Sequence, residues 1–360
     1  MPRLAIVGAG MAGLAAAHAL RTRHSEIDVV AFEKARGVSG RAATRWADVE
    51  HPDGTTRRWR YDHGAQYASP DADGAVADLL RATVGDALVD VPGAVWPFDD
   101  DGTLRPDRAR PPEGVRWTTA DGIAEIGRRI AAATPGLDVQ LQTRVTSVAR
   151  GAGGWTLGVE GEPGAGPFDA VLVTAPGPQA ATLLRDGATA PDLANALADV
   201  FYRAQFVLAW GFDAVLDRPG DVYALVNAAE HGASGGGHDV AWLAVESDKP
   251  GRAPEGCTLL LAQMSETWTE AHYDDAPDAL HAAARAPIET IWGTLPDPLW
   301  TGRQRWRYAL PDTALDTAAC DAAEADGLFV AGDLTAGKGR VHLALADGLA
   351  TAARIAARLG

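Results

Sequence analysis

The chain has 360 residues, of which 47% are hydrophobic and 22% charged, and its formal net charge is −16. Such a length corresponds to about two domains, and the apolar share is enough for a sizeable core, which excludes an intrinsically disordered chain. The excess of acidic groups repels nucleic-acid phosphates and anionic membrane surfaces, so we expect neither as a partner.

Cysteine and lysine usage narrows the cellular setting. Cys257 and Cys320 are the only cysteines, too few for a disulfide framework or a zinc site. No apolar run reaches the roughly 20 residues of a membrane span. We therefore expect a cytoplasmic, metal-free protein without a signal peptide. Only three positions carry lysine, a bias that either codon usage in a GC-rich genome or a salty cytoplasm explains.

The N-terminus predicts a nucleotide-binding βαβ unit. Residues 4–7 form a short apolar strand, residues 11–23 an alanine-rich helix, and residues 27–32 a second strand that ends at Glu33. The first turn reads Gly8-Ala9-Gly10-Met11-Ala12-Gly13, a GxGxxG motif whose third glycine lies 20 residues before the acid. In this context the motif is specific for dinucleotides.

Each part of the motif has a physical task. Gly8 permits the tight turn, Gly10 lets the backbone approach a diphosphate, and Gly13 lets the helix pack close to the strand. The amides of Met11-Ala12, at the helix N-terminus, can face the same diphosphate. Glu33 can accept hydrogen bonds from a ribose 2′-hydroxyl, which favours an unphosphorylated ribose.

A second glycine-rich tract, Gly37-Val38-Ser39-Gly40-Arg41, follows the acid. Placed there, it can fold over the same diphosphate, and Arg41 offers a charge-assisted hydrogen bond. The next segment, residues 61–67, is too polar and too short of capping signals to form a helix.

The middle of the chain is expected to mix helices and strands. Proline and glycine make residues 70–117 irregular around one short helix, whereas the pattern downstream indicates amphipathic helices and buried strands. The expected elements are helices over 75–83 and 121–133, and strands over 139–149, 155–160, 169–174, 206–210 and 258–263.

The C-terminal segment repeats the pattern of the N-terminus. A strand over 327–331 leads to Gly332-Asp333, and Lys338-Gly339-Arg340 precedes a helix over 341–359. Such a turn before a helix N-terminus can face a phosphate or a ring. The sequence therefore predicts an α/β, Rossmann-like nucleotide-binding domain built from both chain ends, with an inserted α+β substrate domain. The expected boundaries are 1–70, 118–180 and 318–360 for the first domain, and 71–117 and 181–317 for the second.

Together these motifs resemble the flavin-containing amine oxidase superfamily, and further stretches are similar to its renalase-like group. The stretches are Tyr61-Asp62-His63-Gly64-Ala65-Gln66-Tyr67, Ala175-Pro176-Gly177-Pro178-Gln179-Ala180, Ser247-Asp248-Lys249-Pro250-Gly251-Arg252 and Arg305-Trp306-Arg307-Tyr308-Ala309-Leu310-Pro311. They are spread over most of the chain, so the resemblance is nearly full length. It implies the two-domain amine-oxidase-like fold with noncovalent FAD.

The resemblance also implies a set of flavin contacts. Glu33 would meet the adenosine ribose, Arg41 the diphosphate, and Val145 the adenine through its backbone. Residues 64–66 would lie along the isoalloxazine ring, and Gly332-Asp333 would meet the ribitol and diphosphate. The expected cofactor-binding residues are Gly8, Gly10, Met11, Ala12, Gly13, Glu33, Lys34, Gly40, Arg41, Gly64, Ala65, Gln66, Tyr67, Val145, Ala175, Gly332, Asp333, Arg340 and Val341.

The chain departs from its relatives at two places. Ser39 stands where they often carry a glycine, and His342-Leu343 stands where they tend to read Glu-Gly. A leucine there puts the shape of the wall beside the flavin pyrimidine in question. His342 is a candidate acid–base group, since histidine titrates near neutrality, or else a structural residue. His63 is either a second acid–base candidate or, as we expect, a structural turn residue held by hydrogen bonds.

Aromatic and basic residues of the C-terminal half are the remaining candidates. Trp306 and Tyr308 are the expected catalytic residues beside His342, and with Trp242 they either wall a planar substrate or belong to the core. Arg305 and Arg307 either order the entrance of the substrate domain or are solvated.

Three functions compete. The renalase-like group implies oxidation of dihydronicotinamide isomers of NAD(P)H by hydride transfer to flavin N5, with dioxygen as acceptor and hydrogen peroxide as product. A dihydropyridine gives up hydride readily, so the pocket mainly orients two rings. The alternatives are an FAD-dependent amine oxidase or desaturase, and a non-catalytic flavoprotein. Amine oxidases typically hold the amine between aromatic rings, one of them C-terminal, and no aromatic residue follows Phe329.

Overall fold

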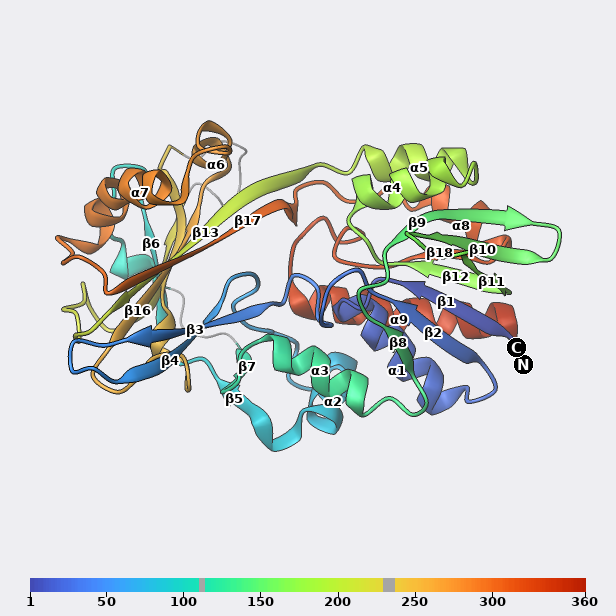
Figure 1. Cartoon of the computed structure of the whole chain (residues 1–360), viewed down its shortest axis with the longest axis horizontal. Helices are drawn as coiled ribbons and strands as arrows, with labels where there is room; N and C mark the ends of the chain where they lie inside the picture. Colours follow the sequence, from blue (N-terminus) through green and yellow to red (C-terminus); the bar gives the residue numbers. More distant parts are fainter. Residues whose placement is uncertain (110–113, 229–236) are drawn as a thin grey trace.

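The structure, a computed structural model, describes residues 1–109, 114–228 and 237–360 and has two lobes (Figure 1). One lobe carries both chain termini and a parallel sheet, and the other carries a mixed six-stranded sheet. Two long paired strands, β13 (Tyr202–Phe212) and β17 (Trp300–Pro311), run from the second lobe toward the first.

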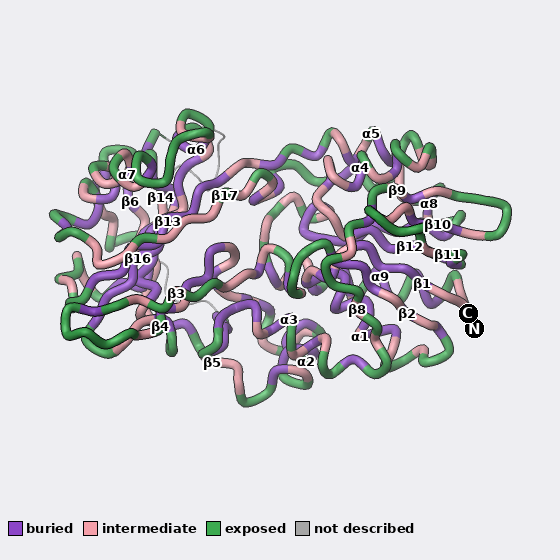
Figure 2. Tube along the Cα trace, in the orientation of Figure 1, coloured by how far each residue is buried: buried purple, intermediate pink, exposed green. Residues whose placement is uncertain are grey.

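Five parallel strands form the sheet of the first lobe. Four of them, β18 (Leu328–Val330), β12 (Ala170–Val173), β1 (Arg3–Val7) and β2 (Asp28–Phe32), are largely buried and apolar because helices cover parallel sheets on both faces, whereas β8 (Asp138–Gln140) lies at the edge and is partly exposed. Figure 2 shows the sheet among the buried parts of the chain. Both chain ends contribute to it, which confirms the predicted Rossmann-like architecture. The spatial order is β18, β12, β1, β2 and β8.

Two helices from opposite chain ends pack together beside this sheet. They are α1 (Met11–Arg23) and α9 (Val341–Leu359). A Cβ atom on Gly348 would overlap the carbonyl oxygen of Ala12, so only glycine allows the close approach. The same lobe holds a three-stranded antiparallel sheet and three more helices. These are β9 (Val145–Gly151), β10 (Gly154–Val159), β11 (Ala165–Phe168), α4 (Gly177–Asp186), α5 (Pro191–Ala198) and α8 (Ala318–Ala325).

The six-stranded sheet of the second lobe is covered on both faces. Residues of β13 alternate, so that Phe206 and Leu208 pack with helix α7 (Pro277–Trp292) on one face while Val207 packs with Trp59 on the other. Its order is β17, β13, β16 (Thr258–Met264), β15 (Val240–Val245), β14 (Val222–Asn227) and β6 (Ala94–Phe98). The covering elements are α6 (Glu266–Ala271), α7 (Pro277–Trp292) and the hairpin β3 (Thr44–Glu50)–β4 (Thr56–Asp62).

The remaining described elements are short. They are α2 (Ala75–Thr83), η1 (Gly85–Ala87), β5 (Leu88–Asp90), η2 (Pro106–Arg108), β7 (Trp117–Thr119), α3 (Ala124–Ala132) and η4 (Glu246–Asp248). Among them, α2 packs on α9 and α3 packs on α1. The predicted helix over 121–133 begins later, at Ala124, because Gly122 has a positive φ and the Ile123 amide donates to Asp62 instead. The predicted domain boundaries stay a prediction.

Two sequence predictions are wrong. The strand expected over 139–149 is two strands, β8 and β9, in different sheets, because the chain turns at Gln142, which has φ +55°. The irregular tract expected over 70–117 contains β6, which pairs in parallel with β14 at the edge of the six-stranded sheet. An edge position tolerates Pro97, since a proline lacks the amide that an inner strand needs. Within the described residues, no helix is long and apolar enough to cross a membrane.

Candidate functional site

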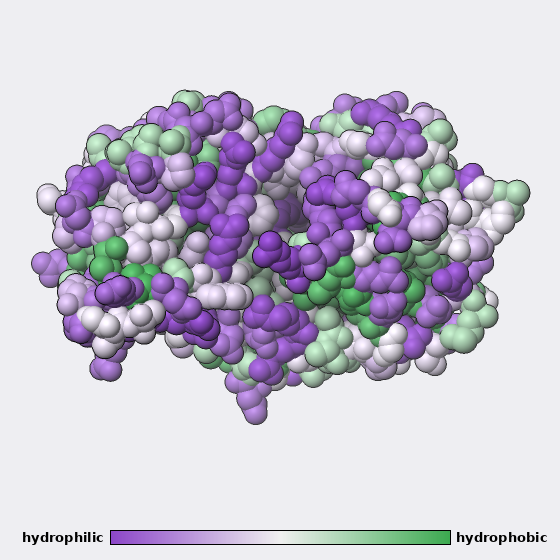
Figure 3. Space-filling model, viewed as in Figure 1, coloured by the Kyte–Doolittle hydropathy of each residue, from purple (hydrophilic) through white to green (hydrophobic). Residues whose placement is uncertain are grey.

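A large cavity lies where the two lobes meet. Its volume is about 1420 Å³, more than the roughly 300–1,000 Å³ of an ordinary small-ligand pocket. The carboxyl ends of β1, β2 and β12 open into it on one side, and β13, β15 and β17 line it on the other. Nucleotides bind at such carboxyl ends in open α/β sheets. Figure 3 shows hydrophilic side chains gathered along the border between the lobes.

The first turn of the chain forms a bare backbone floor in this cavity. Gly8 has φ +108°, and a Cβ atom there would lie 2.6 Å from the Thr174 Oγ1. Gly40 has φ +58° and faces Gly10, whose Cα would lie 3.2 Å from an added Cβ atom. Both glycine tracts therefore meet with no side chain between them, which suits a diphosphate at a helix N-terminus. Gly13 does not line the cavity; it packs against β1.

Glu33 is held rigidly at the end of β2. It is buried, and its two carboxylate oxygens accept hydrogen bonds from the amides of Ala9 and Ala35 at 2.9 and 2.8 Å. The neighbouring Lys34 donates to Gln179 at 3.3 Å, and burial, with the charge of Arg144, lowers its pKa. A fixed carboxylate at this position can bind a ribose hydroxyl.

An ion pair joins the two glycine-rich tracts at opposite ends of the sequence. Arg41 contacts Asp333 at 2.7 Å and also donates to the carbonyl of Ala309 at 2.9 Å. The preceding residue, Gly332, has φ +154°, and its amide donates to Asp347 at 2.8 Å. The geometry brings the predicted diphosphate residues together on one wall of the cavity.

Residues 64–67 form the adjoining wall. A Cβ atom on Gly64 would overlap the carbonyl oxygen of Arg41, and the Ala65 amide donates to that oxygen at 3.1 Å. The Gln66 side chain is buried; its amide nitrogen donates to the Asp62 carbonyl at 2.7 Å, and its oxygen accepts from Lys249 at 3.1 Å. Hydrogen bonds to Asp62 and Lys249 thus fix the side chain of Gln66, while the residue itself lines the cavity.

A buried network of four charges stands beneath Gln66. The side chains of Asp62, Glu246, Lys249 and Arg252 are all 0% exposed. Asp62 contacts Arg252 at 2.6 Å and Lys249 at 3.1 Å, while Glu246 contacts Lys249 at 2.8 Å and Arg252 at 3.2 Å. Burial disfavours the Asp62 carboxylate, but Lys249 and Arg252 outweigh it and lower the pKa of Asp62 to about 2. Two acids and two bases balance within the network, which ties β4 to the turn after β15.

Trp306 and Tyr308 line the opposite wall. Their spacing of two along β17 places them on one face of the strand. Trp306 stacks on His63 with ring centroids 5.5 Å apart, and its indole donates to the His63 carbonyl at 2.6 Å. Tyr308 meets Tyr202 edge-on at 5.9 Å. His63 does not line the cavity, and burial followed by the charge of Arg45 lowers its pKa to about 4, so its ring is neutral at pH 7.

The start of α9 presents an apolar wall. Val341 and Ala344, one helical turn apart, line the cavity, whereas His342 and Leu343 do not. His342 accepts a hydrogen bond from the Ser69 amide at 3.3 Å, and burial lowers its pKa. The Leu343 substitution therefore does not alter the cavity wall, and the placement of His342 favours the structural role.

Every predicted cofactor residue except Gly13 lines the cavity, as do Trp306, Tyr308, Trp242, Arg305 and Arg307. Sequence reasoning missed the lining residues Arg116, Arg203, Gln205 and Gln263, together with the buried network. Nothing local marks them, since they come from separate strands and loops. The one available signal was Lys249, one of only three lysines in the chain.

The cavity is strongly cationic in an acidic protein. Its described lining holds nine basic residues and three acidic ones. The acidic residues are Glu33, Asp186 and Asp333, and all three belong to the first lobe. We call the part lined by the second lobe together with Arg108 and Arg116 the substrate chamber. Within the described residues, the chamber contains arginines and aromatic rings but no carboxylate.

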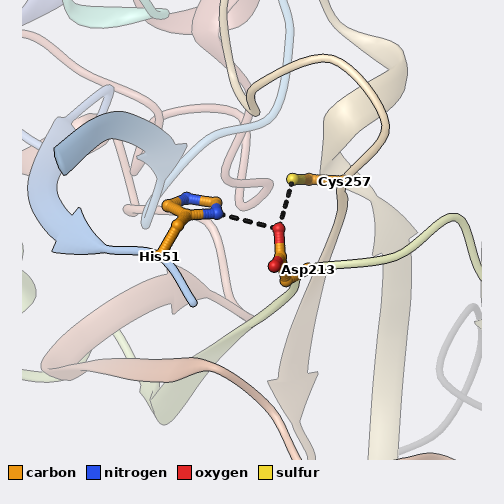
Figure 4. Close-up of side chains that lie close together, drawn as sticks. All are labelled: His51, Asp213 and Cys257. Carbon is orange, nitrogen blue, oxygen red and sulfur yellow. Dashed lines mark hydrogen bonds and ion pairs between the residues drawn. The ribbon is translucent and has the colours of Figure 1, made fainter. Parts of the chain in front are cut away.

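A second polar cluster, far along β13 from this cavity, is not a catalytic or metal centre. His51 lies 2.8 Å from Asp213, and the Cys257 thiol lies 3.5 Å from the same carboxylate oxygen (Figure 4). The His51 Nε2 accepts from the Trp59 indole at 3.2 Å. Because an indole only donates, His51 carries its proton on Nδ1, toward Asp213, and offers no lone pair there to a metal. Burial raises the pKa of Cys257, which disfavours a reactive thiolate. The cluster therefore serves to hold the β3–β4 hairpin to the sheet through hydrogen bonds.

Comparison with known proteins decides the family. The model of the flavin-containing amine oxidoreductases matches residues 98–356, which is most of the chain. The chain belongs to the flavin-containing amine oxidoreductase family. The model of an NAD(P)-binding Rossmann-like domain matches residues 6–83. The protein is accordingly a flavin-dependent oxidoreductase.

Solved structures share the fold of this family member. One, assigned as a protoporphyrinogen oxidase from Exiguobacterium sp. 255-15, superposes with a TM-score of 0.76 at 16% identity over 98% of both chains. A reduced UDP-galactopyranose mutase superposes with a TM-score of 0.74 at 12% sequence identity, over 99% of this chain and 96% of the other. A triple mutant of putrescine oxidase superposes with a TM-score of 0.71 at 16% sequence identity, over 99% of this chain and 100% of the other. At such identities the likeness shows the fold alone.

Proposed function

We propose that this protein binds FAD noncovalently and oxidises dihydronicotinamide isomers of NAD(P)H, with dioxygen as acceptor and hydrogen peroxide as product. The charge of the substrate chamber is the observation that carries the proposal. Arginines line the chamber, and no carboxylate does among the described residues. A dinucleotide is an anion and suits this surface, whereas a protonated amine is a cation and is repelled by it.

The floor of the cavity fits FAD. The bare turn of Gly8 and Gly10 with Gly40 would hold the diphosphate, Glu33 the ribose, and the Arg41–Asp333 pair would flank them. Bound FAD supplies a two-electron acceptor. Noncovalent binding is supported because, among the described lining residues, there is no cysteine or histidine to form a covalent tether.

The chamber residues bind and orient rather than transfer protons. Trp306 and Tyr308 offer flat rings against which a dihydropyridine can stack, and the arginines hold the phosphates. His63 is neutral and does not line the cavity, and His342 also lies off its wall. A hydride donor that becomes aromatic on oxidation needs orientation more than acid–base catalysis, which is what these residues provide.

An aerobic assay separates the candidate functions. The FAD-loaded protein is mixed with 2- and 6-dihydronicotinamide dinucleotides, with the ordinary 4-dihydro form as matched control, and with benzylamine or putrescine. We expect hydrogen peroxide from the 2- or 6-dihydro forms. Peroxide from an amine alone would support an amine oxidase, and no turnover with any of them would support a non-catalytic flavoprotein.

A further inference from the structure

We propose that Arg116 and Trp242 form an oxyanion-binding subsite in the substrate chamber, which receives a carboxylate or phosphate group of the substrate. This inference deepens the proposed function and rests on it for the identity of the substrate, but the binding of an oxyanion by Arg116 is testable by itself.

Arg116 is a buried cation with unused donors. It precedes β7, is only 6% exposed, and lines the cavity. One terminal nitrogen, Nη2, donates to the Gly93 carbonyl at 2.6 Å, and the guanidinium lies 5.7 Å from the centre of the Tyr67 ring. Its Nε and Nη1 have no hydrogen-bond partner within the described part of the chain. Leaving such donors desolvated is costly unless a ligand satisfies them.

The other chamber arginines lack this combination. Arg203 pairs with Asp312 at 3.1 Å, and Arg305 is exposed and donates to the Tyr273 carbonyl at 2.6 Å. Arg116 has no ion pair with a described residue, and no described carboxylate lines the chamber around it. The Nε and Nη1 donors of this planar guanidinium can donate charge-assisted hydrogen bonds to the oxygens of a carboxylate or phosphate.

Trp242 supplies a second donor beside the same ring. It lines the cavity, its ring centre lies 6.5 Å from that of Tyr67, and its Nε1 is buried without an acceptor among the described residues. An indole and a guanidinium only donate hydrogen bonds. Two donor-only groups near the Tyr67 ring favour a ligand rich in hydrogen-bond acceptors over an ammonium group.

The test measures ligand binding to the FAD-loaded protein by calorimetry, with the flavin absorbance as a second readout. Inorganic pyrophosphate probes the phosphate source, benzoate probes the carboxylate source, and uncharged nicotinamide is the control ligand. The variants are Arg116→Met, Arg116→Lys and Trp242→Phe. The control variant is Arg58→Met, which removes an exposed arginine outside the cavity.

We expect Arg116→Met to weaken the binding of one oxyanion at least tenfold and Arg116→Lys to weaken it less. Trp242→Phe should weaken the binding of the same oxyanion a few-fold. Arg58→Met and nicotinamide binding should be unaffected. The unfolding midpoint of Arg116→Met should equal or exceed that of the wild type, because a nearly unpaired buried charge is removed. The ligand that responds names the source of the oxyanion.

Two results would overturn the subsite: no oxyanion binding to the wild type, or unchanged oxyanion binding in Arg116→Met. A failure of the proposed function is distinguishable from both. If dihydronicotinamide isomers do not react but Arg116→Met still loses oxyanion binding, the subsite stands and only the assigned substrate is wrong.

Discussion

The buried network of Asp62, Glu246, Lys249 and Arg252 yields a prediction that depends on charge balance. Replacing Asp62 by Asn leaves two buried cations facing one carboxylate, and removing one partner of a buried pair costs about 3–5 kcal/mol. Lys249→Met leaves two carboxylates facing one cation, with a similar cost. The double variant has one charge of each sign again, in the Glu246–Arg252 pair at 3.2 Å.

We therefore expect each single variant to lose about 3–5 kcal/mol of unfolding free energy, and the double variant to lose clearly less than the sum, with a coupling of about 1–3 kcal/mol. Denaturant unfolding of all four proteins measures this cycle. Arg58→Met, which breaks an exposed pair, is the control and should leave stability nearly unchanged. Additive losses, or single losses below about 1 kcal/mol, would refute charge balance as the reason for the network.

The remaining predictions concern the cofactor and pH. Arg41→Ala should weaken FAD binding by about 1.5–3 kcal/mol, because a charged hydrogen bond is lost; unchanged affinity by equilibrium dialysis would mean that Arg41 does not reach the diphosphate. Acid precipitation should release the flavin into a yellow supernatant, whereas flavin in the pellet would disprove noncovalent attachment. The pKa of His63 is lowered from 6.5 to about 4, so the unfolded state binds more protons in that window and stability falls as pH drops through it. His63→Gln should reduce this slope in urea unfolding at pH 4.5 and 7; an unchanged slope would contradict the burial of His63.

Local sequence signals predicted the nucleotide-binding half well. The strand, glycine turn and helix around Gly8, and the turn at Gly332-Asp333, depend on contacts within a few residues, so their patterns are readable along the chain. The division of residues 139–149 into β8 and β9 could not be predicted from the sequence. The alternating pattern continues through Gln142, and only the backbone conformation of this residue turns the chain. The tertiary pairing of β6 with β14 likewise overrides a proline-rich sequence.

The substrate chamber was less predictable, since its residues meet only through the fold. Arg116 comes from a loop before β7 and Trp242 from β15, and no spacing in the sequence relates them. Lys249 was part of a stretch that resembles the renalase-like group, yet its bond to Gln66 depends on a contact across 183 residues. The position of His342 at a helix start suggested chemistry, and in the structure its ring accepts a hydrogen bond from the Ser69 amide; its catalytic role stays a prediction.

The most direct test of the proposed function is anaerobic stopped-flow mixing of the FAD-loaded protein with 2- and 6-dihydronicotinamide dinucleotides, and separately with benzylamine and a polyamine. The arginine-lined, carboxylate-free chamber predicts that an isomeric dinucleotide bleaches the flavin absorbance much faster than either amine does. Faster bleaching by benzylamine or the polyamine would contradict the proposal and make the protein an amine oxidase.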